Sequence, residues 1–263
     1  MGVAKQYGDV TVIIGGDGVV EVEIHRPPNN FFDADLIGAL SDAYEAIDED
    51  ADCRAIVLCA EGKHFCAGAN FTAPAQAASG PAATIGRNLY SEAARLIEAK
   101  TPVVAAVHGA AIGGGLGLAC SADFRVGSNE TRMATNFAQL GFHHGFGLTI
   151  TLPPLVGQQR AMELLLTGKR IAGEEAHRIG LLDRFVDPAE VRAEARRMAG
   201  EIASSAPLAV KSIRATMRSG LGDRYRAATD HENVEQARLR ATDDFREGVK
   251  ATAERRPPQF RGR

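Results

Sequence analysis

Cysteine is scarce in this chain, and its four cysteines do not form the patterns that mark disulfide-rich or zinc-binding proteins. Cys53, Cys59, Cys66 and Cys120 contain no CxxC pair, and each lies in or beside an apolar run. This arrangement excludes a disulfide framework and a cysteine-based zinc site. It predicts reduced, mostly buried thiols in a cytosolic protein without a metal site.

The chain also lacks a large excess of either charge and any long apolar run. Its net charge of -3 gives no electrostatic basis for binding nucleic acid or an anionic membrane. No stretch approaches the roughly 20 apolar residues of a membrane span, and the N-terminus has no signal-peptide core. A hydrophobic content of 45% is ordinary for a soluble globular protein, so we expect a cytoplasmic location.

The most informative stretch runs from Thr101 to Asp123. An apolar run at 103–107, which suits a buried strand, is followed by the glycine-rich sequence Gly-Gly-Gly-Leu-Gly at 113–117. Glycines at a turn from strand to helix let backbone N–H groups approach a ligand, and a helix N-terminus favours negative charge. The stretch therefore predicts a site that binds or creates an anion. A tight turn with close helix–strand packing is the alternative interpretation.

Strands and helices are predicted to alternate along the first half of the chain, which argues for an α/β core. Residues 72–86 are poor in large apolar side chains and are predicted to be a mobile surface loop near the site. The predicted elements of this half are strands at 10–14 and 19–24, a helix capped by Asp33 or Asp35, a strand at 55–59, a helix at 88–99, and strands at 103–107 and 124–126.

Beyond about Gly145 the pattern changes to helices almost throughout. We expect a core domain of residues 1–200 and a helical C-terminal region of residues 201–263. The predicted helices are 158–166, 188–203, 207–217, 224–241 and 243–254, the second beginning with Asp187 as N-cap and Pro188 as first residue.

Two small-residue loops, taken together and in this order, resemble those of the enoyl-CoA hydratase/isomerase (crotonase) superfamily. They are Lys63-His-Phe-Cys-Ala-Gly-Ala-Asn70 and Ala111-Ile-Gly-Gly-Gly-Leu-Gly-Leu118. Further matches are the segments 121–126, 156–168, 180–183 and 244–248, so the resemblance covers nearly the whole chain. It implies a spiral of ββα turns followed by a helical C-terminal trimerisation region, assembled as a homotrimer or a dimer of trimers.

The resemblance also implies a chemistry. Members of this superfamily bind acyl-CoA thioesters and stabilise an enolate oxyanion with two backbone N–H groups, which by matched position belong to Ala69 and Gly114. Small residues suit this role because the thioester oxygen must come within about 3 Å of the donors. Coenzyme A enters as part of the substrate, and no separate cofactor is expected. The matching residues expected to line the substrate path are Lys63, Ala67, Gly68, Asn70 and Gly113, although Lys63 is equally consistent with a solvated loop charge.

The chain departs from the superfamily at the acid–base pair. Hydratases of this type carry two glutamates, and the matched positions here are Gly117 and Phe137. Adding water across a conjugated double bond needs one group to activate the water and another to protonate the α-carbon. The loss puts ordinary hydratase chemistry in doubt. A glycine and a phenylalanine at these positions also predict a more apolar acyl pocket, with burial of the ring in an ordinary core as the competing account.

Few residues are candidates to replace the missing carboxylates. His143 and His144 follow Gly141 in a loop near the expected site, and a neutral imidazole there is a candidate acid or base. His144 is the favoured one, and a structural hydrogen bond to a loop carbonyl is the alternative for both. Tyr90 is a weaker candidate as a phenol donor, or it packs on the loop.

Three functions remain open from the sequence. The first is an enzyme that acts on an acyl-CoA through an enolate, nominally of the hydratase/isomerase type. The second is a hydrolase of C–C bonds in the same fold, of the β-diketone or ring-opening type. The third is a non-catalytic acyl-CoA-binding protein. A dinucleotide-binding site is disfavoured because Gly113, Gly115 and Gly117 do not form a GxGxxG motif.

Overall fold

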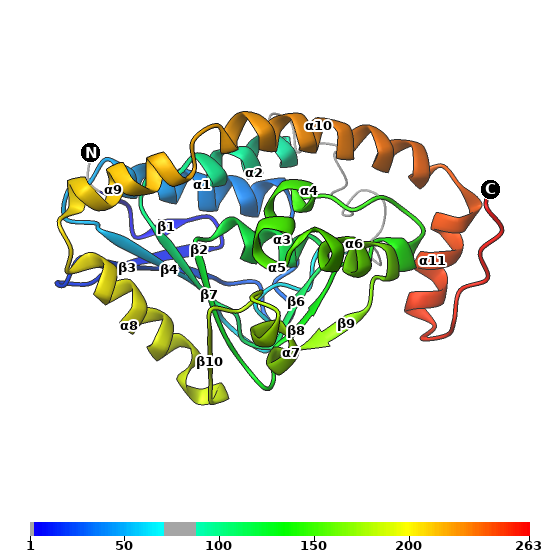
Figure 1. Ribbon diagram of the computed structural model, residues 1–263, viewed down its shortest axis with the longest axis horizontal. Helices are drawn as coiled ribbons and strands as arrows, with labels where there is room; N and C mark the ends of the chain where they lie inside the picture. Colours follow the sequence, from blue (N-terminus) through cyan, green and yellow to red (C-terminus); the bar gives the residue numbers. More distant parts are fainter. Residues whose placement is uncertain (1–2, 71–87) are drawn as a thin grey trace.

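The computed structural model describes residues 3–70 and 88–263 (Figure 1). The mobile loop predicted at 72–86 lies outside the described residues. The described residues form a seven-stranded sheet, in the order β1-β2-β3-β4-β5-β7-β10, and a three-stranded sheet, in the order β6-β8-β9. The strands of the larger sheet are β1 (Gln6–Tyr7), β2 (Val10–Ile14), β3 (Val19–Ile24), β4 (Ala55–Ala60), β5 (Val103–Ala106), β7 (Phe124–Ser128) and β10 (Arg184–Val186).

The strands of the larger sheet change from antiparallel to parallel at β3. β1, β2 and β3 are antiparallel neighbours, whereas β3, β4, β5, β7 and β10 run parallel. Because parallel strands need helical crossovers, this arrangement confirms the predicted α/β core. The predicted strands at 10–14, 19–24 and 55–59 are present as β2, β3 and β4.

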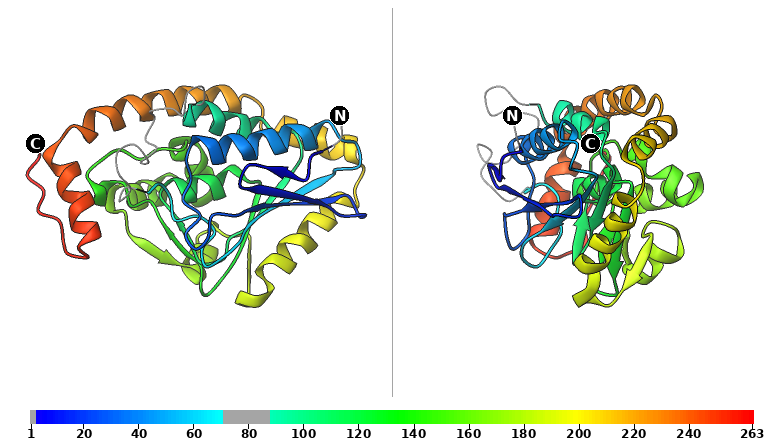
Figure 2. Two further views of the ribbon diagram at one scale, coloured as in Figure 1. Left: turned by 180° about the vertical axis from the view of Figure 1, so that it is seen from behind. Right: turned by 90° about the vertical axis from the view of Figure 1, so that its left-hand side faces the viewer.

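Helices cover both faces of the larger sheet. On one face lie α1 (Ala34–Asp48), α2 (Leu89–Glu98) and the long α10 (Leu221–Arg240), which packs along α2 (Figures 1 and 2). On the other face α8 (Val191–Ala203) packs against β4, β5 and β7. Side-chain caps mark the start of α1 and α2: the Asp33 carboxylate accepts a hydrogen bond from the Leu36 N–H, and the Asn88 side chain accepts from the N–H groups of Tyr90 and Ser91.

The smaller sheet was not predicted from the sequence. Its strands are β6 (Ala110–Ile112), β8 (Arg132–Ala134) and β9 (Arg170–Ala172), each of three residues, too few to show an alternating pattern. β6 leads directly into α3 (Gly114–Ser121), so this sheet fixes the glycine-rich turn. The remaining elements are η1 (Ala138–Leu140), α4 (Leu148–Thr151), α5 (Pro153–Val156), α6 (Gln158–Thr167), α7 (Gly173–Arg178), η2 (Pro188–Glu190), α9 (Pro207–Met217) and α11 (Asp243–Ala253).

The described helices include none that is both long enough and apolar enough to cross a bilayer. The predicted boundary between a core and a C-terminal region at residue 200 stays a prediction.

A buried carboxylate joins helix α9 to the core. Asp123 accepts hydrogen bonds from the Val103 N–H at 2.8 Å and from Arg214 Nε at 2.8 Å, and it pairs with Arg218 Nη1 at 2.7 Å. Burial alone would raise the pKa of Asp123, but the two guanidinium groups outweigh it and lower that pKa. Leu208 and Met217 of α9 are exposed and do not anchor the helix in the core. The contacts of Asp123 therefore contribute much of the attachment of α9.

We predict that Asp123→Ala lowers the free energy of unfolding by about 3–5 kcal/mol, because it leaves two guanidinium groups buried without their carboxylate. Asp123→Asn keeps a hydrogen-bond acceptor and should cost less. Asp52→Ala, at an exposed position, is the control and should change the value by no more than about 0.5 kcal/mol. Urea unfolding followed by circular dichroism measures all three. Equal stability of Asp123→Ala and Asp52→Ala would contradict the assignment.

Candidate active site

The two small-residue loops lie side by side because their backbones are hydrogen-bonded to each other. The Cys66 N–H donates to the Ala110 carbonyl at 3.0 Å, and the Ile112 N–H donates to the Cys66 carbonyl at 3.0 Å. Cys66 and Ala111 form a parallel bridge. The segment that follows β4 therefore continues as a partner of β6, and residues 67–70 are brought next to the start of α3.

Glycine is required where the two loops touch. Gly68 has a φ of +89°, and a Cβ atom there would lie 2.7 Å from the Ile112 carbonyl oxygen. A Cβ atom on Gly115 would collide with the Cys66 carbonyl oxygen. Larger residues at either position would separate the loops, so the small residues in both motifs are explained by this contact.

This contact leaves two backbone donors available at one place. The Gly113 N–H is used by the Ala134 carbonyl at 2.8 Å, whereas in residues 3–70 and 88–263 no backbone or side-chain acceptor is found for the N–H of Ala69 or of Gly114. Gly114 is the first residue of α3, so its N–H points out of the helix N-terminus. Both residues line the same cavity. Two such donors can stabilise negative charge that develops on an oxygen bound between them.

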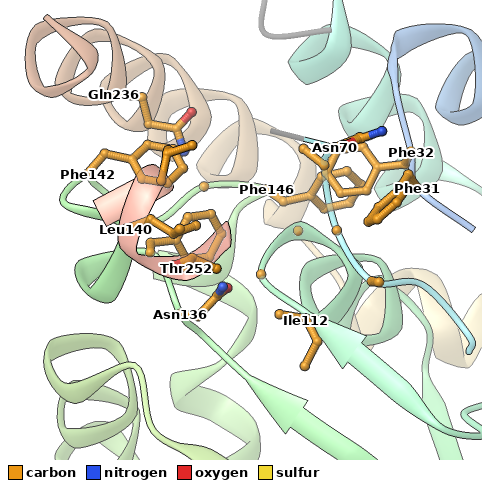
Figure 3. Close-up of a pocket in the computed structure, with 18 of the residues that line it drawn as sticks. Phe31, Phe32, Asn70, Ile112, Asn136, Leu140, Phe142, Phe146, Gln236 and Thr252 are labelled. Atoms are coloured by element: carbon orange, nitrogen blue, oxygen red, sulfur yellow. The ribbon is translucent and has the colours of Figure 1, made fainter. Parts of the chain in front are cut away.

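The cavity beside these donors has a volume of 280 Å³, near the lower end of the ~300–1,000 Å³ typical of ligand pockets. Figure 3 shows Phe31, Phe32 and Asn70 at one end of its lining and Phe142 and Gln236 at the other. The lining includes five phenylalanines, which are Phe31, Phe32, Phe137, Phe142 and Phe146. Its polar side chains are those of Asn70, Tyr90, Asn136, Gln236, Arg240 and Thr252.

No Asp, Glu or His occurs among the described residues that line the cavity. The sequence of residues 71–87, which the structure does not describe, contains none of these residue types either. In the same described ranges, no group of three or more His, Cys, Asp or Glu side chains is arranged to hold a metal ion. The described lining is therefore mostly apolar and offers two backbone donors and several polar side chains, but no carboxylate or imidazole.

Gly117 and Phe137, the two positions expected to match the glutamates of the superfamily, differ in their relation to the cavity. Phe137 lines the cavity, and its ring lies 3.6 Å from where a Cβ atom on Gly113 would be. Gly117 is buried in α3 and is not among the described residues that line the cavity. A Cβ atom at this position would lie 2.7 Å from the Cβ atom of Phe146. Phe146 has a positive φ of 59°, which is unusual for a residue other than glycine, and its ring centroid lies 5.3 Å from that of Phe32. Phe146 therefore occupies the space into which a side chain at position 117 would extend.

The structure does not bring His143 or His144 into the cavity. The His144 Nε2 lies 2.8 Å from the Thr149 hydroxyl, which in turn donates to the Glu232 carboxylate at 2.6 Å. The His144 Nε2–H therefore donates to the Thr149 hydroxyl, so the neutral form of the ring is the Nε2–H tautomer. Burial, followed by the neighbouring imidazoles of His143 and His231, lowers the pKa of His144 to about 4. His143 stacks on His144 at 4.1 Å between ring centroids.

Lys63 also lies away from this cavity, whereas Ala67, Gly68 and Asn70 line it as expected. The Lys63 side chain belongs to a separate groove of 400 Å³ at the carboxyl ends of β4, β5 and β7, which His108 and Arg192 also line. Its expected role along the coenzyme A path stays a prediction.

Helix α10 supplies polar residues that the sequence analysis missed. The Tyr90 hydroxyl donates to Gln236 Oε1 at 2.9 Å, and Arg240 Nη2 donates to the same oxygen at 3.3 Å. Glu232, Gln236 and Arg240 are spaced four residues apart and therefore lie on one face of the helix. Two of the three are buried. The sequence signal that could have identified these residues is the repeat of a polar residue at every fourth position.

Comparison with known proteins agrees with this geometry. The sequence model described as "Enoyl-CoA hydratase/isomerase" matches residues 15–263. A probable enoyl-CoA hydratase of Bacillus subtilis is 32% identical over 249 residues, which are 93% of this chain and 95% of the relative. A carnitinyl-CoA dehydratase of Proteus mirabilis is 32% identical over 250 residues, with the same shares covered.

Solved structures give the same result. The crystal structure of an enoyl-CoA hydratase/isomerase from Pseudoalteromonas atlantica superposes with a TM-score of 0.85 at 30% identity, covering 96% of this chain and all of that one. A carnitinyl-CoA dehydratase from Mycobacterium avium superposes with a TM-score of 0.83 at 27% identity, covering 97% of this chain and 99% of that one. The chain belongs to the enoyl-CoA hydratase/isomerase family and has the crotonase fold.

Proposed function

We propose that the protein binds an acyl-CoA thioester and stabilises its enolate by holding the thioester oxygen between the N–H groups of Ala69 and Gly114. The observation that carries the proposal is the pair of unused donors where the two loops meet, beside an apolar cavity. Because the described lining holds no Asp, Glu or His, solvent hydroxide takes the α-proton and becomes water. The electron pair of the C–H bond moves to the thioester oxygen, and fixed donors about 3 Å away lower the free energy of that state. The names of the relatives specify enoyl-CoA and carnitinyl-CoA, both of which are thioesters.

The proposal limits which reactions the site supports. Hydration of a conjugated enoyl group needs a base for water and an acid for the α-carbon, each worth about 100- to 10,000-fold in rate. Neither is present among the described lining residues, and the positions matched to the family pair are Gly117 and Phe137. We therefore propose enolate stabilisation without efficient hydration. Acyl-CoA binding without turnover is the second candidate function, and the same missing carboxylates favour it.

Self-association as a homotrimer or a dimer of trimers is also part of the proposal. The large apolar side chains left exposed on α9 support it: Leu208 is 84% exposed, Ile213 63% and Met217 80%. An exposed cluster of this kind is typical of surfaces that are covered by another chain.

We predict that the protein catalyses exchange of the α-protons of butanoyl-CoA with deuterated water but does not hydrate crotonyl-CoA appreciably. Mass spectrometry of the recovered ester measures the exchange, and loss of enoyl-thioester absorbance measures hydration. A family member that retains both glutamates is the control, and the hydration rate should be at least about 100-fold lower than that of the control. Binding without exchange would favour the second candidate, and no binding would overturn both.

We predict that removing the Gly114 N–H lowers the exchange rate by about 100- to 1,000-fold. Any side chain at position 114 would collide with the Phe32 ring, so the test uses a Phe32→Ala background. In that background Gly114→Ala and Gly114→Pro both carry a Cβ atom, but only proline lacks the N–H. Proline is tolerated at the first position of a helix, so folding should survive. Equal exchange rates in the two variants would contradict the assigned donor.

We predict that His144→Gln leaves α-proton exchange unchanged and flattens the dependence of stability on pH. The folded state holds His144 neutral with a pKa of about 4, against an ordinary value of 6.5, while His143, His231 and Glu232 surround it. Unfolding lets the imidazole take up a proton, so stability should fall as pH drops from about 6.5 to about 4. The wild type should lose about 1–3 kcal/mol more than the variant over this range. Loss of exchange in His144→Gln would instead assign it to the chemistry.

A further inference from the structure

Arg240 lies at the end of the cavity away from the small-residue loops. Its guanidinium carbon is 5.5 Å from the centroid of the Phe142 ring, and its Nη2 is 3.3 Å from Gln236 Oε1. Phe142 and Gln236 lie at one end of the lining, whereas Phe32, whose ring covers Gly114, lies at the other (Figure 3). A ligand whose carbonyl meets Ala69 and Gly114 would therefore extend its far end toward Arg240.

The Arg240 guanidinium has no carboxylate partner in the described part of the chain. Its Nε is buried and has no hydrogen-bond acceptor, and no ion pair joins it to an Asp or Glu. Residues 1–2 and 71–87 contain no acidic residue, so they cannot supply one. Burial without a nearby carboxylate lowers the pKa of Arg240, although arginine remains charged at neutral pH. A half-buried cation whose buried Nε has no acceptor among the described residues is a costly arrangement that a bound anion would relieve.

The groups around Arg240 are held in one orientation. Gln236 Oε1 accepts from both the Tyr90 hydroxyl and Arg240, while its Nε2 donates to the His143 carbonyl at 3.0 Å. A Cβ atom on Gly145 would collide with both the Tyr90 hydroxyl and the Gln236 amide, so only glycine leaves room for the pair. Arg240 donates to this amide only through Nη2, and its Nε has no acceptor among the described residues, so donors of Arg240 remain available to a ligand.

We propose that this cavity selects an acyl group that ends in a carboxylate, with Arg240 binding that carboxylate. The inference rests on the proposed acyl-CoA site and deepens it by naming the substrate class: CoA thioesters of short dicarboxylic acids. The cavity suits a methylene chain, because the apolar side chains of Phe137, Leu140 and Phe142 contribute to its lining. A carboxylate is favoured over a neutral acceptor because a guanidinium forms shorter, roughly twofold stronger hydrogen bonds to an ionised oxygen. The volume of 280 Å³ favours a short chain.

Calorimetry with matched pairs of esters tests the proposal: succinyl- against butanoyl-CoA, glutaryl- against pentanoyl-CoA, and adipoyl- against hexanoyl-CoA. Each pair differs only in the terminal group, so affinity for coenzyme A itself cancels. We expect the carboxylated ester to bind about 10- to 100-fold more tightly at one chain length, since a charged hydrogen bond is worth about that factor. The preference should peak at one length because both ends of the site are fixed.

Three variants distinguish the role of Arg240 from that of its surroundings. Arg240→Met keeps the length of the side chain and should abolish the preference, whereas Arg240→Lys keeps the charge and should retain part of it. Gln236→Glu places a carboxylate beside Arg240 and should abolish the preference while Arg240 itself is intact. No preference at any length, or an equal loss of affinity for both esters in Arg240→Met, would overturn the inference but leave the proposed function standing. Failure of every ester to bind would overturn the proposed function as well.

Discussion

The structure of the site depends on the backbone pairing between the segment at Cys66 and strand β6. This pairing brings together two loops that are more than forty residues apart in the chain, and it works only because glycine occupies positions 68 and 115. The same contact leaves the N–H groups of Ala69 and Gly114 without partners among residues 3–70 and 88–263. A backbone oxyanion hole requires no particular side chain, so it can persist when the side chains of the acid–base pair are lost.

Gly117, which is expected to match one of the superfamily's glutamates, is structurally linked to Phe146. Glycine at 117 lets Phe146 approach α3, and Phe146 then excludes any side chain from position 117. Phe146 also takes a positive φ, a backbone state that costs free energy for a residue other than glycine. A glutamate placed at 117 would therefore collide with Phe146. Aromatic rings line much of the cavity, and its polar side chains include those of Arg240, Gln236 and Tyr90.

Much of the fold could be predicted from local sequence signals. Asp33 and Asn88 are side-chain caps, the runs at 10–14, 19–24 and 55–59 are buried strands, and the two glycine-rich loops identified both the family and the expected donors. The three-residue strands β6, β8 and β9 could not be predicted, because so short a segment is fixed by its neighbours rather than by its own pattern. The orientation of the His144 side chain could not be predicted either. It is set by the buried Glu232, which lies 88 residues further along the chain and holds Thr149 in place.

The carbonyl ¹³C chemical shift of a bound acyl-CoA labelled at the thioester carbon tests the central claim most directly. Two donors on the oxygen polarise the carbonyl, so the signal should move downfield on binding to the wild type. In the Phe32→Ala background it should move less with Gly114→Pro than with Gly114→Ala. A bound ester whose carbonyl shift is the same as in water, or is unaffected by proline at 114, would contradict the assignment of Ala69 and Gly114 as the oxyanion hole.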